Sequence, residues 1–211
     1  DLPLIGFCGS PWTLAAYSIE GGGSKDFNKT KNFMKEYPKE LQEFLDILTN
    51  ACYEYLKQQV FSGVNALQIF DSWADLLSGN DLEKLSLQYT RKLTSLLKTD
   101  PLTSNIPIIL FEKAPKKNVV DWVFKDIACV SLYWKEDIES VAKDLKNKYV
   151  IQGNLDPNVL MKSDESIRNE TQKICSIMNK YPGFIFNLGH GITPNIKPIK
   201  VKVMIDAIRE T

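Results

Sequence analysis

The stretch VNALQIFDS at residues 64–72 carries the clearest indication of the fold. Its apolar residues follow one another almost without interruption, which is typical of a strand covered on both faces in a parallel sheet. The sequence predicts six such strands, because five other runs of strand length show the same pattern. They are LPLIGFCG (2–9), IPIILFEK (106–113), ACVSLYW (128–134), KYVIQGNL (148–155) and GFIFNLGHG (183–191).

Segments with a helical spacing of apolar residues separate these runs. Leu41, Leu45, Cys52 and Leu56 fall on one face of a helix. Strands that alternate with helices form parallel βαβ units with right-handed crossovers, so we expect an α/β fold. Further helices are expected at residues 82–97, capped by Asn80 or Asp81, at 135–148, from Ser163 onward, and at 196–210.

Two α/β architectures accommodate this order, an open doubly wound sheet and a (β/α)8 barrel. An eight-unit barrel usually needs about 250 residues, so six strands in 211 residues taken alone favour the open sheet. The first predicted strand is not followed by a Gly-x-Gly-x-x-Gly motif, which argues against a dinucleotide site. No internal repeat or linker divides the chain.

The charges of the chain indicate which partners to expect. Lys and Arg (26) balance Asp and Glu (26), so there is no broad basic field and nucleic acid is not an expected partner. Only Arg91, Arg168 and Arg209 are arginines. Arginine is the usual residue for gripping carboxylates, because its guanidinium forms paired hydrogen bonds. If the ligand is a polyacid, we expect its main anchors to lie outside this chain.

The four cysteines, Cys8, Cys52, Cys129 and Cys175, stand alone in or beside apolar stretches. Without CxxC or CxH spacing a metal site is not expected, and buried reduced thiols in a cytoplasmic protein are the simplest interpretation. No apolar run approaches the ~20 residues that span a bilayer, and no secretory signal is visible, so no membrane partner is expected. The chain starts at Asp1 directly before a predicted strand, which suggests that it begins inside a larger protein.

Both architectures place active sites at the carboxyl ends of the strands. Polar segments follow the predicted strands at residues 9–25, 71–77, 112–117, 153–157 and 189–194, and the last contains His190, the only histidine. The candidate residues also have plain structural interpretations. Tyr17 could be a half-buried aromatic, Ser72 a helix cap and His190 a structural hydrogen-bonding group.

Four segments taken together are more specific. PWTLAAYSIEGGGSK (11–25), ALQIFDSWADLLS (66–78), IQGNLDP (151–157) and NLGHGITP (187–194) resemble the motifs of the uroporphyrinogen decarboxylase family, in the same order and at matching intervals. The resemblance implies a (β/α)8 TIM barrel in place of the open sheet, with about the last six βα units present. Residues 1–211 would then form a single domain, an incomplete barrel that lacks the amino-terminal units.

Carried over by position, the resemblance implies that Tyr17, Ser72 and His190 bind the substrate and that Phe70 lines the cleft. It implies no catalytic residue in this chain. The family's arginine-rich motif and its central aspartate match nothing here, and we expect them upstream of Asp1.

Two positions depart from the family pattern: Tyr133 stands where an aspartate is usual, and Ala114 where glycine is common. A barrel with missing units also leaves the first and last strands with an unpaired edge, unless another segment fills it. An open edge invites pairing with other chains, so we expect the 211 residues alone to be poorly soluble.

The family removes the carboxyl groups of the four acetate side chains of uroporphyrinogen III, giving coproporphyrinogen III in heme biosynthesis, without a metal or an organic cofactor. The resemblance therefore implies a cytoplasmic, homodimeric carboxy-lyase with a small-molecule tetrapyrrole substrate, and a fragment that is inactive alone. Two alternatives remain: a tetrapyrrole-binding barrel fragment without turnover, and a corrinoid-type methyltransferase of the same superfamily. The zinc-binding His-x-Cys pair of the latter is missing, because Gly191 and Ile192 follow His190.

Overall fold

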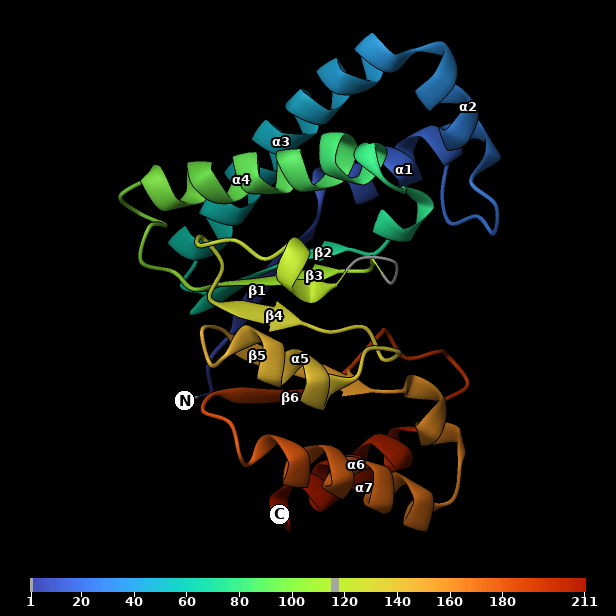
Figure 1. The fold of residues 1–211 in the computed structure, drawn as a ribbon, viewed down its shortest axis with the longest axis vertical. Helices are drawn as coiled ribbons and strands as arrows, with labels where there is room; N and C mark the ends of the chain where they lie inside the picture. Colours follow the sequence, from blue (N-terminus) through green and yellow to red (C-terminus); the bar gives the residue numbers. More distant parts are fainter. Residues whose placement is uncertain (1, 115–117) are drawn as a thin grey trace. The chain divides into compact units, whose positions relative to one another are not determined.

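The computed structural model describes residues 2–114 and 118–211 (Figure 1). All six predicted strands are confirmed. They are β1 (Ile5–Gly9), β2 (Ala66–Asp71), β3 (Ile108–Glu112), β4 (Cys129–Ser131), β5 (Val150–Leu155) and β6 (Phe184–Leu188). The α-helices between and after them are α1 (Pro11–Glu20), α2 (Asn28–Glu36), α3 (Pro38–Phe61), α4 (Gln88–Thr99), α5 (Ile138–Leu145), α6 (Asp164–Met178) and α7 (Pro198–Arg209). Shorter turns are the 3₁₀ segments η1 (Ala74–Leu76), η3 (Val119–Asp121) and η4 (Pro157–Met161), and the π-helical η2 (Leu82–Leu87).

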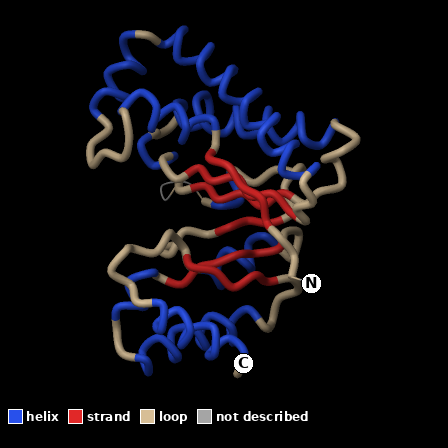
Figure 2. Tube along the Cα trace, turned by 180° about the vertical axis from the view of Figure 1, so that it is seen from behind, coloured by secondary structure: helices blue, strands red, loops and turns tan. Residues whose placement is uncertain are grey.

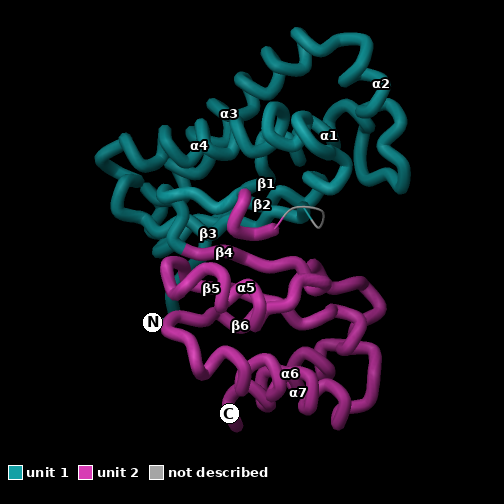
Figure 3. The backbone as a smooth tube through the Cα atoms, viewed as in Figure 1, with its two compact units in different colours: residues 1–117, 122–128 teal, residues 118–121, 129–211 magenta. Residues whose placement is uncertain are grey.

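The chain divides into two compact units (Figure 3): unit 1 comprises residues 1–117 and 122–128, and unit 2 residues 118–121 and 129–211. In unit 1, β2 pairs in parallel with β1 and with β3. In unit 2, β5 pairs in parallel with β4 and with β6. Strand neighbours within each unit follow chain order, whereas a doubly wound sheet reverses its order at a switch point. The fold is therefore the α/β class predicted, six βα units of a (β/α)8 barrel, and the single domain over residues 1–211 stays a prediction.

Strand β2 shows which face of the unit 1 strands the helices cover. Its last residue, Asp71, accepts hydrogen bonds from Thr13 of α1 and from Ser86, just before α4. Alternate residues of a strand share a face, so Leu67 and Ile69 point toward the same helices, and both are fully buried. Figure 2 shows the helices of this unit gathered on one side of its strands. On the opposite face of these strands, the described part of unit 1 places no helix.

Unit 2 has its own apolar core, formed where α6 and α7 pack against the ends of β5 and β6. Its buried members include Leu155 of β5, Leu160 of η4, Ile167 of α6 and Met204 of α7. Phe186 of β6 packs against the same cluster while remaining partly accessible. These contacts fix the closing helix, which was expected at residues 196–210 and spans Pro198–Arg209.

Helix starts were predicted with mixed success. The Ser163 hydroxyl accepts a hydrogen bond from the N–H of Ser166 and caps α6, as expected. The expected cap of Asn80 or Asp81 on the helix at 82–97 is wrong. The backbone is already helical at Asp81, so its side chain makes no cap hydrogen bond, and a π-helical turn precedes α4. Helix α5 is shorter than the predicted 135–148, because the Asp137 carboxylate caps its first turn and Lys146 is left-handed.

The four cysteines are buried free thiols, as the sequence predicts. Burial raises the pKa of Cys129 to about 12, so this thiol stays protonated at neutral pH. In the part of the chain that is described, no helix combines the length and the apolar character needed to cross a bilayer.

The outer edge of β1 is occupied by a side chain. Leu4 and Ser10 bond to the β2 side, so the N–H and C=O of Phe7 point away from β2. The Gln59 carboxamide of α3 meets both groups: Phe7 N donates to Oε1 at 2.8 Å, and Nε2 donates to Phe7 O at 3.0 Å. Gly6 permits this approach, since a Cβ there would collide with Gln59 Oε1. Part of the edge that was expected to be unpaired is therefore satisfied within the chain.

We expect Gln59→Leu to lower the free energy of unfolding by about 1–2 kcal/mol, because two backbone groups lose their protein partners. Urea unfolding followed by circular dichroism measures this change. Gln58→Leu is the matched control, since Gln58 is the preceding residue of α3 and is exposed. Equal stability of the two variants would contradict a capping role for Gln59.

Candidate functional site

Tyr17 lies on α1, the helix that follows β1. The Ser10 hydroxyl caps this helix by accepting a hydrogen bond from Thr13 N at 3.0 Å. Tyr17 is 38% exposed. Its ring packs edge-on against the rings of Trp73 (centroids 5.8 Å apart, 82°) and Phe27 (6.3 Å, 63°). Helix α1 therefore presents Tyr17 at the surface, with its orientation set by two aromatic rings.

Ser72 begins the turn that follows β2. It is half-buried between Asp71, the last residue of the strand, and Trp73, which precedes η1. The start of η1 has no side-chain cap, so the helix-cap interpretation of Ser72 is not supported. Within residues 2–114 and 118–211, no hydrogen bond engages the Ser72 hydroxyl. This hydroxyl can therefore serve a ligand.

The carboxylate of Asp71 holds this turn and α1 together. Asp71 is 0% exposed. Thr13 Oγ1 donates to its Oδ1 at 2.8 Å, and Ser86 Oγ donates to its Oδ2. Thr13 Oγ1 also accepts from Trp73 N at 3.3 Å, and Trp12 Nε1 donates to Trp73 O at 2.9 Å. Burial raises the pKa of Asp71, while the hydroxyl donors oppose part of that rise.

Lys113 stands directly after β3, beside the Ser72 turn. The register pairs Asp71 with Glu112, and Lys113 N donates to Asp71 O at 3.0 Å, which extends the ladder one step beyond the strand. The ammonium of Lys113 lies 2.9 Å from Asp75 Oδ2 and 5.3 Å from the centre of the Trp73 ring. A cation and an indole ring therefore flank this turn.

Phe70 lies on the helix-free face, in a row of three aromatic rings that crosses unit 1. Its ring centroid is 6.0 Å from that of Phe7 and 6.0 Å from that of Phe111. Such a row offers an apolar wall near the strand ends, which suits the face of a flat ligand. Ala114 is buried after β3, and the remainder of that predicted segment, residues 115–117, lies outside the described residues.

In unit 2 the loop after β4 is fixed by the end of β5. Asn154 is buried, and its Nδ2 donates to the backbone oxygens of Tyr133 at 3.0 Å and Glu136 at 2.8 Å. Two carbonyl groups of an irregular loop thus receive their hydrogen bonds from one side chain. The GNLDP segment therefore shapes the neighbouring loop. Within the segment, the Asp156 carboxylate caps the start of η4 by accepting a hydrogen bond from Asn158 N.

His190 follows β6 and is exposed, with its ring edge-on to Tyr133 (centroids 6.1 Å apart, 75°). Close packing requires the glycine at position 189, directly before His190. A Cβ at Gly189 would collide with the backbone N of Trp134 and lie 2.5 Å from its Cα. Around Gly191, by contrast, a Cβ would meet nothing within 4 Å. Gly189 therefore lets the loop after β4 pack against the strand end, and open space lies only after His190.

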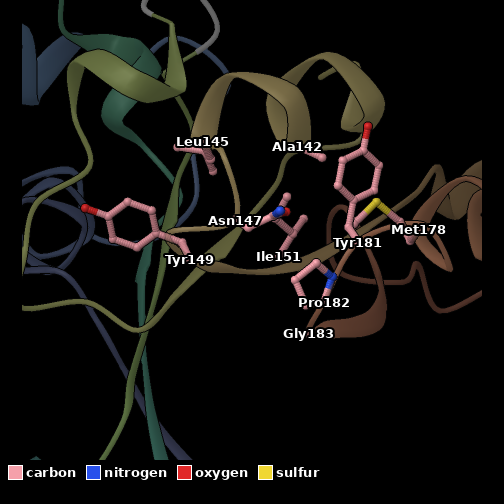
Figure 4. A pocket seen from close by; sticks show the side chains of 9 residues that line it. All are labelled: Ala142, Leu145, Asn147, Tyr149, Ile151, Met178, Tyr181, Pro182 and Gly183. Carbon is pink, nitrogen blue, oxygen red and sulfur yellow. The ribbon is translucent and has the colours of Figure 1, made fainter.

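The opposite end of unit 2 holds a narrow hollow, whose lining residues are shown in Figure 4. It lies beside the first residues of β5 and β6, among Tyr149, Ile151, Met178, Tyr181 and Gly183. The amino ends of barrel strands serve stability, and the carboxyl ends serve activity. This hollow is accordingly not the candidate site.

Tyr17 packs against Trp73, the residue that follows Ser72, so Tyr17 and the Ser72 turn belong to the same part of unit 1. His190 belongs to unit 2 and is described there by itself. Asp71 and Lys113 were not predicted as site residues, although each is adjacent to a strand end and could have been suspected from that position. Among the described residues, no three His, Cys, Asp or Glu side chains form a group that could hold a metal ion.

Comparison with known proteins places this chain in a family. The family model described as Uroporphyrinogen decarboxylase (URO-D) matches residues 1–211. Curated relatives named uroporphyrinogen decarboxylase include those of Ruthia magnifica subsp. Calyptogena magnifica and Pseudomonas putida (strain W619), each 41% identical over 209 residues, and one from Pseudomonas aeruginosa at 39%. These matches cover 99% of this chain and 60%, 59% and 59% of the relatives, so the chain spans about three fifths of their length.

A solved structure with the same fold is a methyltransferase from Methanosarcina mazei. Its TM-score is 0.72 and its sequence identity 22%, and the match covers 100% of this chain and 59% of that chain. At this identity the likeness concerns the fold alone.

We expect Gly189→Ala to destabilise unit 2 by about 1–3 kcal/mol, because the added methyl group forces the backbone of the loop after β4 to move. Gly191→Ala, two residues away in open space, is the matched control and should be close to neutral. Thermal or urea unfolding compares the two variants. A Gly189→Ala variant as stable as Gly191→Ala would contradict the close approach of Trp134.

The raised pKa of Asp71 predicts a pH dependence. The folded protein holds this proton more tightly than the unfolded chain, whose Asp pKa is about 3.9. The contribution of Asp71 to stability is therefore full below about pH 4 and is lost as the pH rises through the folded pKa. We expect the stability of Asp71→Asn relative to the wild type to increase from about pH 4 to pH 7, as measured by urea unfolding. Asp81→Asn, at an exposed helix start, is the control, and a flat or inverted difference for Asp71→Asn would overturn the assignment.

Proposed function

The chain belongs to the uroporphyrinogen decarboxylase family, and on that premise we propose that it forms part of an enzyme that converts uroporphyrinogen III to coproporphyrinogen III by removing four acetate carboxyl groups as CO₂. The observation that carries the proposal is the match of the family model to the whole chain, residues 1–211. The geometry supports it, since Tyr17 on α1 packs against Trp73, the residue after Ser72, and Phe70 of the same unit belongs to a row of aromatic rings.

The chemistry makes modest demands on a protein, because the pyrrole supplies its own electron sink. Protonation of a ring carbon places positive charge on the ring nitrogen. The electrons of the bond to the carboxylate then move into the ring as CO₂ leaves, and the exocyclic carbon takes up a proton to become a methyl group. The ring carbon finally gives up the proton that it gained in the first step, which restores the aromatic pyrrole. Each cycle therefore consumes one proton net and releases one CO₂. The protein must exclude water, hold the substrate and stabilise the transient cation.

In this proposal Tyr17, Ser72 and His190 bind the substrate. The hydroxyl groups of Tyr17 and Ser72 donate hydrogen bonds to substrate carboxylates without adding a positive charge that would oppose the cationic ring. His190, exposed at the end of β6, donates a hydrogen bond or forms an ion pair with a carboxylate at the periphery. Phe70 and its neighbouring rings provide the apolar wall.

The stabilising aspartate is not assigned to a residue of this chain. Asp71 lies at a strand end, but it is fully buried on the helix-covered face and bonded to hydroxyl groups. It therefore positions the turn and does not touch the ring. We propose that these 211 residues bind and orient the substrate, and that turnover needs the part of the family's length that they do not span.

Assembly and location belong to the proposal as well. The resemblance to the family supports a homodimer in the cytoplasm with a tetrapyrrole substrate. The balance of basic and acidic residues gives no support to a nucleic-acid partner. The methyltransferase alternative receives no support beyond the shared fold.

A chimera tests the function. The 209 matching residues of the Ruthia magnifica relative are replaced by this chain, and release of CO₂ from uroporphyrinogen III is measured for the chimera and for the 211 residues alone. We expect turnover only in the chimera. His190→Asn in the chimera should weaken substrate binding about ten- to a hundred-fold, the value of one hydrogen bond to a charged group, and leave measurable activity.

Several outcomes would overturn this assignment. A folded chimera that binds uroporphyrinogen without turnover would favour the binding fragment. Turnover by the 211 residues alone would show that the catalytic group lies within this chain. Complete loss of activity in a folded His190→Asn chimera would make His190 the essential acid, and sedimentation of the chimera as a monomer at micromolar concentration would contradict the homodimer.

A further inference from the structure

We propose that Lys113 is a further binding residue of the site, which pairs with a carboxylate of the tetrapyrrole in exchange for its present partner Asp75. The inference rests on the proposed function, because it needs a substrate rich in carboxylates. It adds a cation to a site for which the sequence suggested only neutral donors and one histidine.

The position of Lys113 follows from the strand register. Asp71 lies opposite Glu112, and Lys113 N donates to Asp71 O, so the next pair across the ladder is Ser72 and Lys113. Opposed residues of parallel strands point to the same face, and successive residues alternate. Since Asp71 faces the helices, Ser72 and Lys113 belong to the opposite side, which also carries Phe70.

Trp73 connects Lys113 to Tyr17. The ammonium lies 5.3 Å from the centre of the Trp73 ring, and the Tyr17 ring packs edge-on against the same indole at 5.8 Å. Lys113, Ser72 and Tyr17 are therefore grouped around one aromatic side chain. One ligand carboxylate, or two on neighbouring arms of a large ring, could reach all three.

The ion pair between Lys113 and Asp75 is suited to exchange. Nζ and Oδ2 are 2.9 Å apart, and the two side chains are 14% and 29% exposed. Lys113 is largely covered, and Asp75 is the more accessible of the two partners. A largely covered cation is costly to leave without a partner, so exchange of one carboxylate for another is favoured over simple loss of Asp75. Asp75 occupies the place of a ligand carboxylate.

The arginine of unit 1 is committed elsewhere. Arg91 is the sole arginine in the sequence of unit 1, and its guanidinium pairs with Glu83 on η2 and lies over the Phe124 ring. A polyacid that docks against Tyr17 and Ser72 would meet Lys113, a cation beside the Ser72 turn. A lysine makes a single point contact with a carboxylate, which tolerates a substrate whose acetate arms are removed one after another.

The test uses the chimera described above and uroporphyrin III, the oxidised and unreactive analogue of the substrate, as the probe. Quenching of protein fluorescence gives the dissociation constant at low and at high salt. We expect Lys113→Met to raise it about ten-fold at low salt, and less at high salt because ions screen a partly exposed charge. Lys113→Arg should restore most of the binding. Asp75→Asn, which removes the competing carboxylate, should tighten binding a few-fold.

The control is Lys92→Met. Lys92 forms a comparable but more exposed ion pair with Asp46 at 2.6 Å, between α4 and α3. We expect this variant to bind as the unsubstituted chimera does. If Lys113→Met binds equally well, or if the salt dependence is unchanged, Lys113 is only the partner of Asp75 and the inference is overturned. If Lys113→Met does not fold, the other two variants decide: Lys113→Arg should keep most of the affinity for uroporphyrin, and Asp75→Asn should raise it. An Asp75→Asn variant that binds only as well as the unsubstituted chimera overturns the inference. An unsubstituted chimera that fails to bind uroporphyrin would overturn the proposed function itself.

Discussion

The arrangement of unit 1 depends on the burial of one carboxylate. A charged group without water is tolerated only where donors surround it, and Asp71 finds them in segments far apart in the sequence. Thr13 comes from α1 and Ser86 from the π-helical turn. The same threonine also receives the backbone N–H of Trp73. One anion therefore fixes the start of α1, the turn after β2 and the approach to α4, and the orientations of Tyr17 and Ser72 follow from it.

Much of the fold could be read from the sequence, because unbroken apolar runs identify parallel strands whatever surrounds them. The candidate segments were found because strand ends carry function in βα folds, and the resemblance to the family singled out Tyr17, Ser72 and His190 within them. The partners of Asp71 could not be found in this way, since Thr13 and Ser86 look like ordinary helix residues until the chain is folded. The π-helical turn was missed for the same reason, because the cap at Asp81 was inferred from local residue preference alone. In the structure the backbone is already helical at Asp81, and Ser86 of the π-helical turn bonds to the distant Asp71. Local patterns specify elements, whereas long-range hydrogen bonds specify how their ends are joined.

The comparisons and the geometry together suggest a division of labour. The chain spans about three fifths of its curated relatives and contains three arginines. Unit 1 contains an aromatic wall on its strands, a tyrosine hydroxyl on α1, a serine hydroxyl after β2 and the ion pair at the Ser72 turn. In the proposed function, these groups orient a large flat ligand by shape and by weak, directional hydrogen bonds. The proposal assigns the stronger electrostatic work of the reaction to the part of the family's length that this chain does not span.

The contact between Gly189 and Trp134 has a consequence for how this protein can change over evolutionary time. The atoms that exclude a side chain at position 189 are the backbone nitrogen and Cα of residue 134 as well as its Cβ. No compensating substitution at residue 134 can remove backbone atoms, so a variant at 189 has no single-residue suppressor there. Space for a side chain at 189 therefore comes from a shift of the loop backbone, at a cost in stability, or from an insertion or deletion in the loop after β4. Tolerance at position 189 is governed by the path and length of a neighbouring loop and not by the side chains that this loop carries.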